Sequence, residues 1–270
     1  MFGQSIKQGG AILDAKMRGS RLAGKNAVVT GAGRGIGKGV ALMMARQGAR
    51  VLACDINAGS LDQLRNEALS EGLTNLEIHA ADLTDEAGAN GLGDKAEALF
   101  GSVEILVNAA AIVVFNWIDQ MSFAEWRKTI AGELDTVFLV TRRIWPLMKP
   151  NGGSIINFSS ANAHVALDTS PAIAHCAGKG GVLAMTRQMA MEGGKIGIRA
   201  NSIAPGFIIT EETERHLSNP EMMRAVKTKA MVDLLGTPDD IGYLAVYLGS
   251  DESRYVTGAD LSIDGGATAW

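Results

Sequence analysis

Four glycines within residues 28–37 have the types and spacing that most clearly suggest chemistry. The segment reads Val-Val-Thr-Gly-Ala-Gly-Arg-Gly-Ile-Gly, and apolar residues at helical spacing follow it. Glycines let a backbone come close to a diphosphate, and the free N–H groups in the first turn of a helix attract negative charge. The stretch therefore predicts a strand, a tight turn and a helix that together bind a dinucleotide.

Asp55 is the second candidate, because it ends a β-branched and apolar run at residues 50–55. At this distance past the glycines, a carboxylate can accept from both hydroxyls of an adenosine ribose and would repel a 2′-phosphate. NAD is therefore favoured over NADP, although Arg34 inside the turn could pair with a phosphate. Asp55 could also be a simple turn or helix-capping acid, but its place at a strand end favours the ribose role.

Composition and charge exclude several classes of protein. The chain has 270 residues, 47% of them hydrophobic and 20% charged, with a net charge of −4, so it offers no basic field for nucleic acid. No apolar run is long enough to cross a bilayer, and the N-terminus lacks the apolar core of a secretion signal. Cys54 and Cys176 have neither metal-ligand nor disulfide-framework spacing. We expect a cytoplasmic protein without a metal site or a membrane or nucleic-acid partner.

The elements that must position these residues alternate along the chain. Strands are expected at residues 26–30, 50–55, 76–80, 103–107, 154–158, 198–203 and 261–264. Helices are expected after the glycine turn, at 60–71, 85–100, 122–149 and 172–192, and from residue 237 onward; Ser122 and Glu125 form a capping box. This alternation predicts a single α/β domain with a Rossmann-type, doubly wound parallel sheet and helices on both faces.

Two segments lie outside this regular pattern. Residues 1–24 precede the first strand and contain several basic residues against a single acid, Asp14. We expect an arm that is solvated or packs on another subunit, followed by the dinucleotide-binding domain at residues 25–270. Residues 208–235 mix apolar and charged side chains with several methionines. We expect this segment to form a flexible lid that covers the substrate, and its composition favours a partly apolar small molecule as that substrate.

Five motifs in this order resemble those of the short-chain dehydrogenase/reductase family. They are Thr-Gly-Ala-Gly-Arg-Gly-Ile-Gly at 30–37, Asn-Ala-Ala-Ala at 108–111, Asn-Phe-Ser-Ser at 157–160, Asn-Ser-Ile-Ala-Pro-Gly at 201–206, and the Asp-Gly-Gly ending of 260–266. The resemblance implies a nicotinamide cofactor, NAD by the Asp55 argument. It also implies a homotetramer packed through the helices at 122–149 and 172–192 and the end of the sheet.

The resemblance further implies which residues hold the cofactor. The expected contacts are Gly31, Gly33, Arg34, Gly35, Ile36, Gly37, Asp55, Asp82, Leu83, Asn108, Ala109, Ala110, Lys179, Pro205, Gly206, Ile208 and Thr210. Among them, Asp82 and Leu83 would lie against the adenine. Ile208 and Thr210 would lie at the nicotinamide carboxamide, and Lys179 would hold the nicotinamide ribose.

The chain departs from the family at the residues that handle the proton. The family uses a Tyr-x-x-x-Lys pair, whereas His175 stands four residues before Lys179, and the tyrosines of this chain all come much later. Glu133 replaces the asparagine of the long helix. Ser160 is present, although its spacing to His175 is about two residues longer than usual, which leaves Ser159 and Asn162 as less favoured alternatives.

These departures leave three hypotheses. In the first, an NAD-dependent dehydrogenase interconverts a secondary alcohol and a ketone, with Ser160 polarising the oxygen and His175 or a water handling the proton. In the second, bound NAD serves a non-redox elimination, hydrolysis or dehalogenation, with His175 and Glu133 as base and acid. In the third, the chain is a degenerate or engineered NAD-binding variant. We favour the three hypotheses in that order. In each of them, the Glu133 carboxylate could pair with the Lys179 ammonium.

Overall fold

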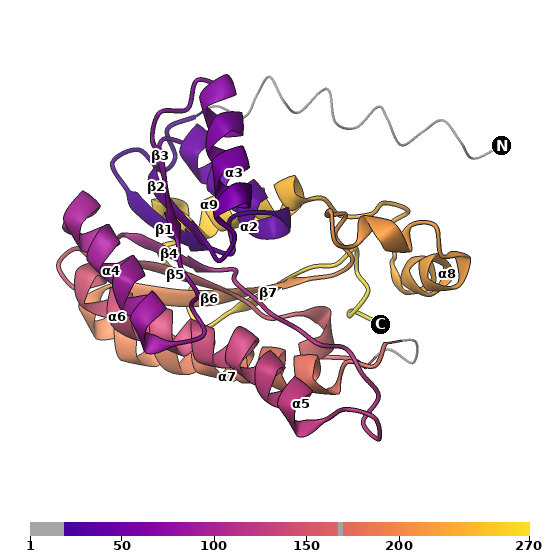
Figure 1. Cartoon of the computed structure of the whole chain (residues 1–270). Helices are drawn as coiled ribbons and strands as arrows, with labels where there is room; N and C mark the ends of the chain where they lie inside the picture. The colour runs from indigo at the N-terminus through magenta and orange to yellow at the C-terminus, as the bar shows by residue number, and fades with distance from the viewer. Residues whose placement is uncertain (1–18, 167–169) are drawn as a thin grey trace.

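The computed structural model describes residues 19–166 and 170–270, and its centre is a parallel sheet in the order β3-β2-β1-β4-β5-β6-β7 (Figure 1). The strands are β1 (Asn26–Thr30), β2 (Arg50–Asp55), β3 (Leu76–Ala80), β4 (Ile105–Asn108), β5 (Gly153–Phe158), β6 (Ile198–Pro205) and β7 (Asp260–Ile263). The strand order reverses between β1 and β4, the point at which ligands bind in sheets of this kind. The predicted Rossmann-type α/β fold is confirmed.

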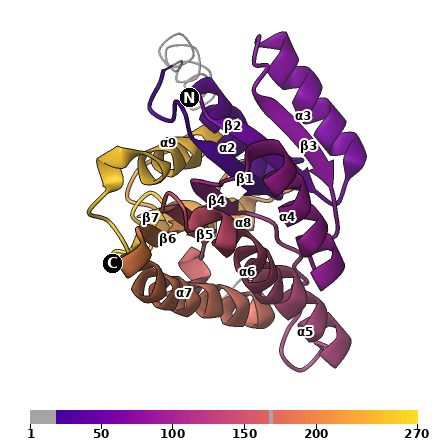
Figure 2. The same cartoon turned by 90° about the vertical axis from the view of Figure 1, so that its left-hand side faces the viewer.

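Helices cover both faces of the sheet (Figures 1 and 2). One face carries α2 (Gly35–Arg46), α3 (Ala58–Ser70) and α9 (Pro238–Gly249), and the other carries α4 (Glu86–Phe100), α6 (Thr136–Met148) and α7 (Ile173–Gly193). Shorter helical turns are η3 (Ala161–Ala163), η4 (Gly194–Ile196), η5 (Glu214–His216) and η6 (Asp251–Ser253). The sheet is therefore covered by helices on both faces, as the sequence predicts.

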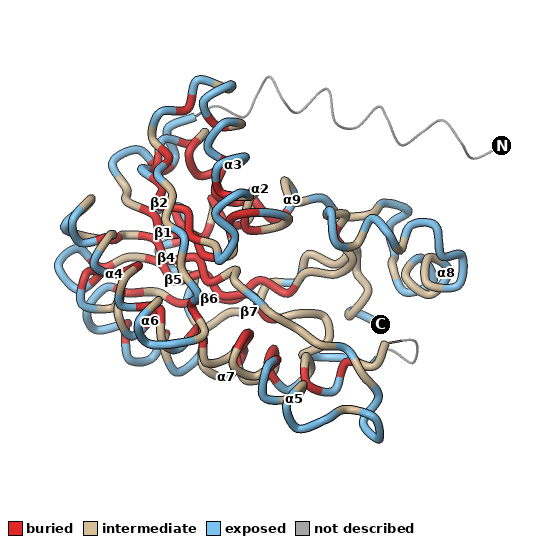
Figure 3. The backbone as a smooth tube through the Cα atoms, viewed as in Figure 1, coloured by how far each residue is buried: buried red, intermediate tan, exposed pale blue. Residues whose placement is uncertain are grey.

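Two apolar cores result from the alternation of side chains along each strand. In β1, Ala27 and Val29 belong to the core under α2, α3 and α9, whereas Val28 belongs to the core under α4 and α6. The red central tube of Figure 3 follows these buried strands. Complete burial on both faces explains why the strands read as continuous apolar runs in the sequence.

The expected continuous helix at residues 122–149 is wrong in one respect. Its capping box is present, because the Ser122 hydroxyl accepts from Glu125 N and the Glu125 carboxylate accepts from Ser122 N. However, α5 (Phe123–Ile130) and α6 are separated by a π-helical turn, η2 (Ala131–Asp135). A π turn inserts one residue and rotates the helix that continues beyond it, and such turns are frequent at functional sites. Here the turn contains Glu133.

Four predicted strands have other bounds, and two of these, β5 (Gly153–Phe158) and β7 (Asp260–Ile263), are shifted by one residue at one end or both. The strand expected from residue 103 begins at Ile105, because the Val103 amide donates to the Leu147 carbonyl at the end of α6 instead of joining the sheet. The strand expected to end at residue 203 continues to Pro205, which lies opposite Ile263 of β7. These differences leave the predicted alternation of strands and helices unchanged.

The two segments outside the regular pattern are described in part. Of the expected arm at 1–24, residues 19–24 are described, and Leu22 is fully buried while Arg21 pairs with Glu252 at 2.6 Å. Part of the expected arm therefore packs on the domain. The expected lid includes α8 (Pro220–Lys229), which projects away from the sheet in Figure 1. Among the described residues, no helix has the length and apolar character needed to cross a bilayer.

Candidate active site

The glycine turn between β1 and α2 has the tight backbone that its sequence predicts. Gly31 and Gly35 have φ angles of 63° and 56°, a region that side chains disfavour. A Cβ on Gly37 would lie 2.1 Å from the Gly31 carbonyl oxygen, and a Cβ on Gly31 would lie 2.7 Å from Ala110 N. Ile36 is half-buried and packs against the core. The turn can therefore present backbone N–H groups to a ligand at close range.

Asp55 lies against this turn, as expected from its place at the end of β2. Its Oδ2 accepts from Gly33 N at 2.9 Å, and its Oδ1 accepts from Asn57 N at 2.9 Å. A Cβ on Gly33 would meet the Asp55 carboxylate at 2.9 Å. The backbone thus holds a fixed negative charge beside the turn, where a ribose would have hydroxyls to donate.

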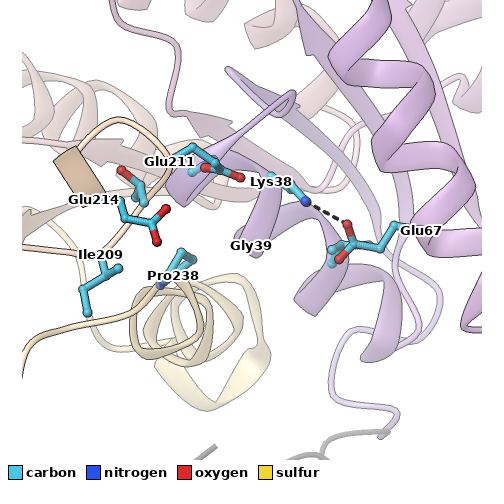
Figure 4. Close-up of a pocket in the computed structure, with 10 residues that line it drawn as sticks. Lys38, Gly39, Glu67, Ile209, Glu211, Glu214 and Pro238 are labelled. Carbon is cyan, nitrogen blue, oxygen red and sulfur yellow. Dashed lines mark hydrogen bonds and ion pairs between the residues drawn. The ribbon is translucent and has the colours of Figure 1, made fainter. Parts of the chain in front are cut away.

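Acidic side chains from the expected lid also reach the turn. Glu211 Oε2 accepts from Gly35 N at 3.1 Å, and Glu212 Oε2 lies 3.6 Å from Nη1 of Arg34. A cavity of about 360 Å³ lies between this segment and α2 (Figure 4). On its far side Lys38 is paired with Glu67 at 2.8 Å. A carboxylate of the chain itself therefore uses an N–H group that the sequence assigns to a diphosphate.

The asparagine motif after β4 is fixed by hydrogen bonds. Asn108 is buried, and its Nδ2 donates to Thr141 Oγ1 at 3.0 Å and to Asn157 Oδ1 at 2.8 Å. The backbone amides of Ala109 and Ala110 both donate to Thr30 Oγ1 at 3.1 Å. Nδ2 of Asn108 is thus bonded within the domain, whereas its Oδ1 is buried without a hydrogen-bond partner among the described residues, and the segment that follows it lies over the end of β1.

The remaining expected cofactor contacts lie around the same edge of the sheet. Asp82 is exposed and accepts from the Thr84 amide and hydroxyl, whereas the side chain of Leu83 is buried in the core. Pro205 ends β6, and Gly206 N donates to the Ile263 carbonyl. Ile208 is buried, and Thr210 Cγ2 would lie 3.4 Å from a Cβ on Gly35. Thr210 therefore adjoins the turn, while Leu83 and Ile208 turn their side chains inward.

The four expected catalytic residues come together from three elements. Glu133 Oε1 of the π turn lies 2.7 Å from Nδ1 of His175 on α7. His175 Nε2 lies 3.4 Å from Oγ of Ser160, which follows β5. Nζ of Lys179, one helical turn beyond His175, lies 3.8 Å from Glu133 Oε1 and donates to the Phe158 carbonyl at 3.2 Å. The longer loop between Ser160 and His175 does not separate them.

Glu133 faces two partners. The expected ion pair with Lys179 is present, and His175 lies nearer still by the distances above. The Glu133 side chain is 1% exposed, and its Oε2 is buried without a hydrogen-bond partner among the described residues. Burial lowers the pKa of Lys179, and the adjacent Glu133 carboxylate counteracts part of this effect. The buried carboxylate thus faces two nitrogen groups at once.

The three candidates for the serine role, Ser159, Ser160 and Asn162, have different contacts. Ser159 is buried, and its hydroxyl contacts the Ile203 carbonyl and Asp260, away from His175. Asn162 N donates to Ser160 Oγ at 3.1 Å and so holds that side chain in place. The ring of Phe115 lies 5.6 Å from the ring of His175. Ser160 is therefore the serine that meets His175.

The sequence offers two further loop residues, His164 and Asp168, which could lie at a substrate mouth but are interpreted as solvated. His164 is exposed, and its Nε2 also lies 2.6 Å from Oδ2 of Asp260 at the start of β7. The hydroxyls of Ser159 and Ser202 bond to Oδ1 of the same carboxylate. No local pattern links a loop histidine to an aspartate 96 positions away. Asp168 lies outside the described residues.

Comparison with known proteins decides the family. A family model described as enoyl-(acyl carrier protein) reductase matches residues 31–268. D-threitol dehydrogenase of Mycolicibacterium smegmatis is 35% identical over 92% of this chain and 94% of its own length. The chain belongs to the short-chain dehydrogenase/reductase family. Two further relatives bear on the cofactor of this short-chain dehydrogenase/reductase.

These two relatives use different nicotinamide cofactors, according to their names. An NADP-dependent (R)-specific alcohol dehydrogenase of Lentilactobacillus kefiri is 37% identical over 92% of this chain and 98% of its own length. A 7α-hydroxysteroid dehydrogenase solved with NADH superposes with a TM-score of 0.86 at 31% identity, over 92% of this chain and 96% of that one. The relatives support an oxidoreductase with a nicotinamide cofactor and leave the choice between NAD and NADP to the residues of the chain.

Proposed function

We propose that this short-chain dehydrogenase/reductase interconverts a secondary alcohol and a ketone with NAD, and that His175 handles the proton in place of the family's tyrosine. The contact of 2.7 Å between Glu133 and His175 carries the proposal. The chain departs from the family at these two positions, and the two new side chains are chemically complementary. Independent decay of a site gives no reason for such a match, so we favour a working site over a degenerate one.

The pair has a defined arrangement of protons. A carboxylate accepts hydrogen bonds, so Glu133 favours the tautomer with its proton on Nδ1 of His175. Nε2 then carries the lone pair and faces Ser160. In alcohol oxidation, the substrate hydroxyl would donate its proton to Nε2, and Glu133 would stabilise the imidazolium that forms. In ketone reduction His175 would return the proton, while the Ser160 hydroxyl would donate to the carbonyl oxygen.

The residues at the glycine turn fit a nicotinamide dinucleotide. The turn allows close approach of a diphosphate, and the Asp55 carboxylate beside Gly33 would accept from ribose hydroxyls and repel a 2′-phosphate. Arg34, the one residue of the turn that could favour NADP, already faces Glu212. When bound, the cofactor would accept or donate the hydride. We assign it the contacts that the sequence predicts, with Lys179 near the nicotinamide ribose.

The proposal also includes a class of substrate, an oligomeric state and a cellular location. Phe115 beside His175, and the exposed Met231, Val232 and Leu234 of the expected lid, favour a partly apolar small-molecule substrate. Exposed apolar side chains on the helices at 122–149 and 172–192 support the homotetramer expected from the family. The two described free cysteines, Cys54 and Cys176, agree with a cytoplasmic location.

The proposal is tested by NADH absorbance with a panel of secondary alcohols and ketones. We expect turnover by the wild-type protein, a loss of about 100-fold or more in kcat for His175→Ala, and partial recovery when free imidazole is added. His79→Ala, on the edge strand β3, is the control and should retain activity. Absence of cofactor turnover with every substrate across the pH range, or full activity of His175→Ala, would overturn the proposal.

A further inference from the structure

Ser160, His175 and Glu133 also form one continuous chain of side-chain contacts. A hydroxyl, an imidazole and a carboxylate follow one another, with 3.4 Å between Ser160 Oγ and His175 Nε2 and 2.7 Å between His175 Nδ1 and Glu133 Oε1. This order of nucleophile, base and orienting acid defines a nucleophilic triad, which is identified by geometry and not by sequence position. The longer first distance is within the range of ligand-free enzymes, in which such contacts tighten on binding.

The contacts of Ser160 leave its proton free to move to the imidazole. Asn162 N donates to Ser160 Oγ, so this contact uses an oxygen lone pair and not the hydroxyl proton. The proton can therefore point to Nε2 of His175, whose lone pair is available because Nδ1 faces the carboxylate. The first turn of η3 fixes the side chain of Ser160, and α7 fixes that of His175. The nucleophile and its base are thus positioned by rigid elements.

The hydroxyl of Ser160 is available for chemistry, whereas that of its neighbour Ser159 is not. Ser159 is buried and is tied to Ile203 O and Asp260, whereas Ser160 is half-buried and adjoins the candidate active site. The amide of Asn162 could serve a substrate, since its Nδ2 lies 3.9 Å from the weakly accepting Sγ of Cys176. A donor of this kind could turn to an oxyanion formed at Ser160.

We propose that Ser160 is an activated nucleophile and that the protein hydrolyses activated carboxylic esters without a nicotinamide cofactor. Ser160 Oγ would form a bond to the carbonyl carbon as its proton moves to Nε2 of His175. The bond from that carbon to the leaving oxygen would then break, and the leaving group would depart with its electron pair and the proton from His175. Water would attack the acyl-serine with help from His175, releasing the carboxylic acid and restoring Ser160. No oxidation or reduction occurs.

The test uses the full chain without added nicotinamide and two probes. A fluorophosphonate should phosphonylate Ser160, with loss of fluoride, and p-nitrophenyl acetate should give a burst of p-nitrophenolate with an acetyl group on the same residue by peptide mass spectrometry. We expect Ser160→Ala to abolish both adducts and His175→Asn to slow labelling by about 100-fold or more. Ser262→Ala, an exposed serine on β7, is the matched control and should label as the wild type does.

Each outcome decides the proposal. Labelling confined to Ser160 and dependent on His175 supports it. Absence of an adduct, an adduct on another residue, or equal rates in the wild type and His175→Asn overturns it, provided that circular dichroism shows both proteins folded. The dehydrogenase proposal is measured separately by NADH absorbance, so a protein that oxidises alcohols without labelling would disprove the triad alone.

Discussion

Glu133 Oε1 contacts Nδ1 of His175 at 2.7 Å, and this contact makes Glu133 a positioning residue for the imidazole. Glu133→Gln keeps the size of the side chain but allows it to donate to Nδ1, which favours the wrong tautomer. We expect kcat to fall by about 10- to 100-fold, because groups that orient a functional histidine have effects of this size. NADH affinity, measured by fluorescence titration, should change little. An unchanged kcat, or a loss of NADH affinity equal to the loss of kcat, would contradict the role.

Gly132 allows the π turn to lie close to the chain before α5. A Cβ at this position would lie 2.6 Å from Cβ and from the carbonyl oxygen of Ile112, so Gly132→Ala must displace the turn that contains Glu133. We expect a loss of about 1–3 kcal/mol in the free energy of unfolding, together with a lower kcat.

Gly180→Ala is the matched control for this substitution. Gly180 lies within α7, and a Cβ there would meet nothing within 4 Å in the described part of the chain beyond its own helix backbone and its two neighbours. We expect a gain of about 0.5–1 kcal/mol in stability from the higher helix propensity of alanine. Denaturant unfolding measures both variants. A stabilising effect of Gly132→Ala would show that the turn does not depend on close packing.

Glu211 and a cofactor diphosphate would compete for the amide of Gly35. Glu211→Gln removes the negative charge from this contact, so we expect the Kd for NADH to fall by about 3- to 10-fold, on the scale of a charge-assisted hydrogen bond. Glu214→Gln is the control, because Glu214 lines the same cavity. Fluorescence titration at two salt concentrations separates a local contact from a general charge effect. Equal changes in both variants would refute direct competition.

Asp55 should set the cofactor preference. Asp55→Asn removes the charge that would repel a 2′-phosphate and keeps an acceptor for Gly33 N. We expect the affinity for NADPH to rise and the affinity for NADH to fall, each measured by binding without substrate. The proposed NAD preference would be wrong if the wild-type protein bound NADPH more tightly than NADH.

Asp251 gives a prediction about stability and pH. The hydrogen bond and charge of Lys25 hold the pKa of Asp251 below its ordinary 3.8. A carboxylate with a depressed pKa stabilises the fold above 3.8, and this contribution is lost as the pH falls through the folded-state pKa. Asp251 is largely exposed, so Asp251→Asn should lower stability at pH 7 by at most about 1 kcal/mol. The difference between the two proteins should disappear in acid; a constant difference would exclude this origin.

Several features could be predicted from the sequence because they depend on local patterns. Glycines at fixed spacing predict the turn of residues 31–37, alternation of apolar segments predicts the parallel sheet, and Ser122 with Glu125 predicts the start of α5. The resemblance to the family likewise points to Glu133 and His175 as the residues at the expected proton-transfer positions. Each of these features depends on residues close together in sequence, or on the order of elements along it.

Only the tertiary structure decided how the side chains of Glu133 and His175 meet. The π turn contains Glu133, and its packing on α7 brings the Glu133 carboxylate to 2.7 Å from His175 and 3.8 Å from Lys179. The contact between Glu211 and Gly35 N and that between His164 and Asp260 likewise join residues far apart in the chain. Such contacts depend on the packing of one element on another, which hydrophobic periodicity does not specify. The sequence by itself determined the fold and the residues available for chemistry, and packing determined which of them touch.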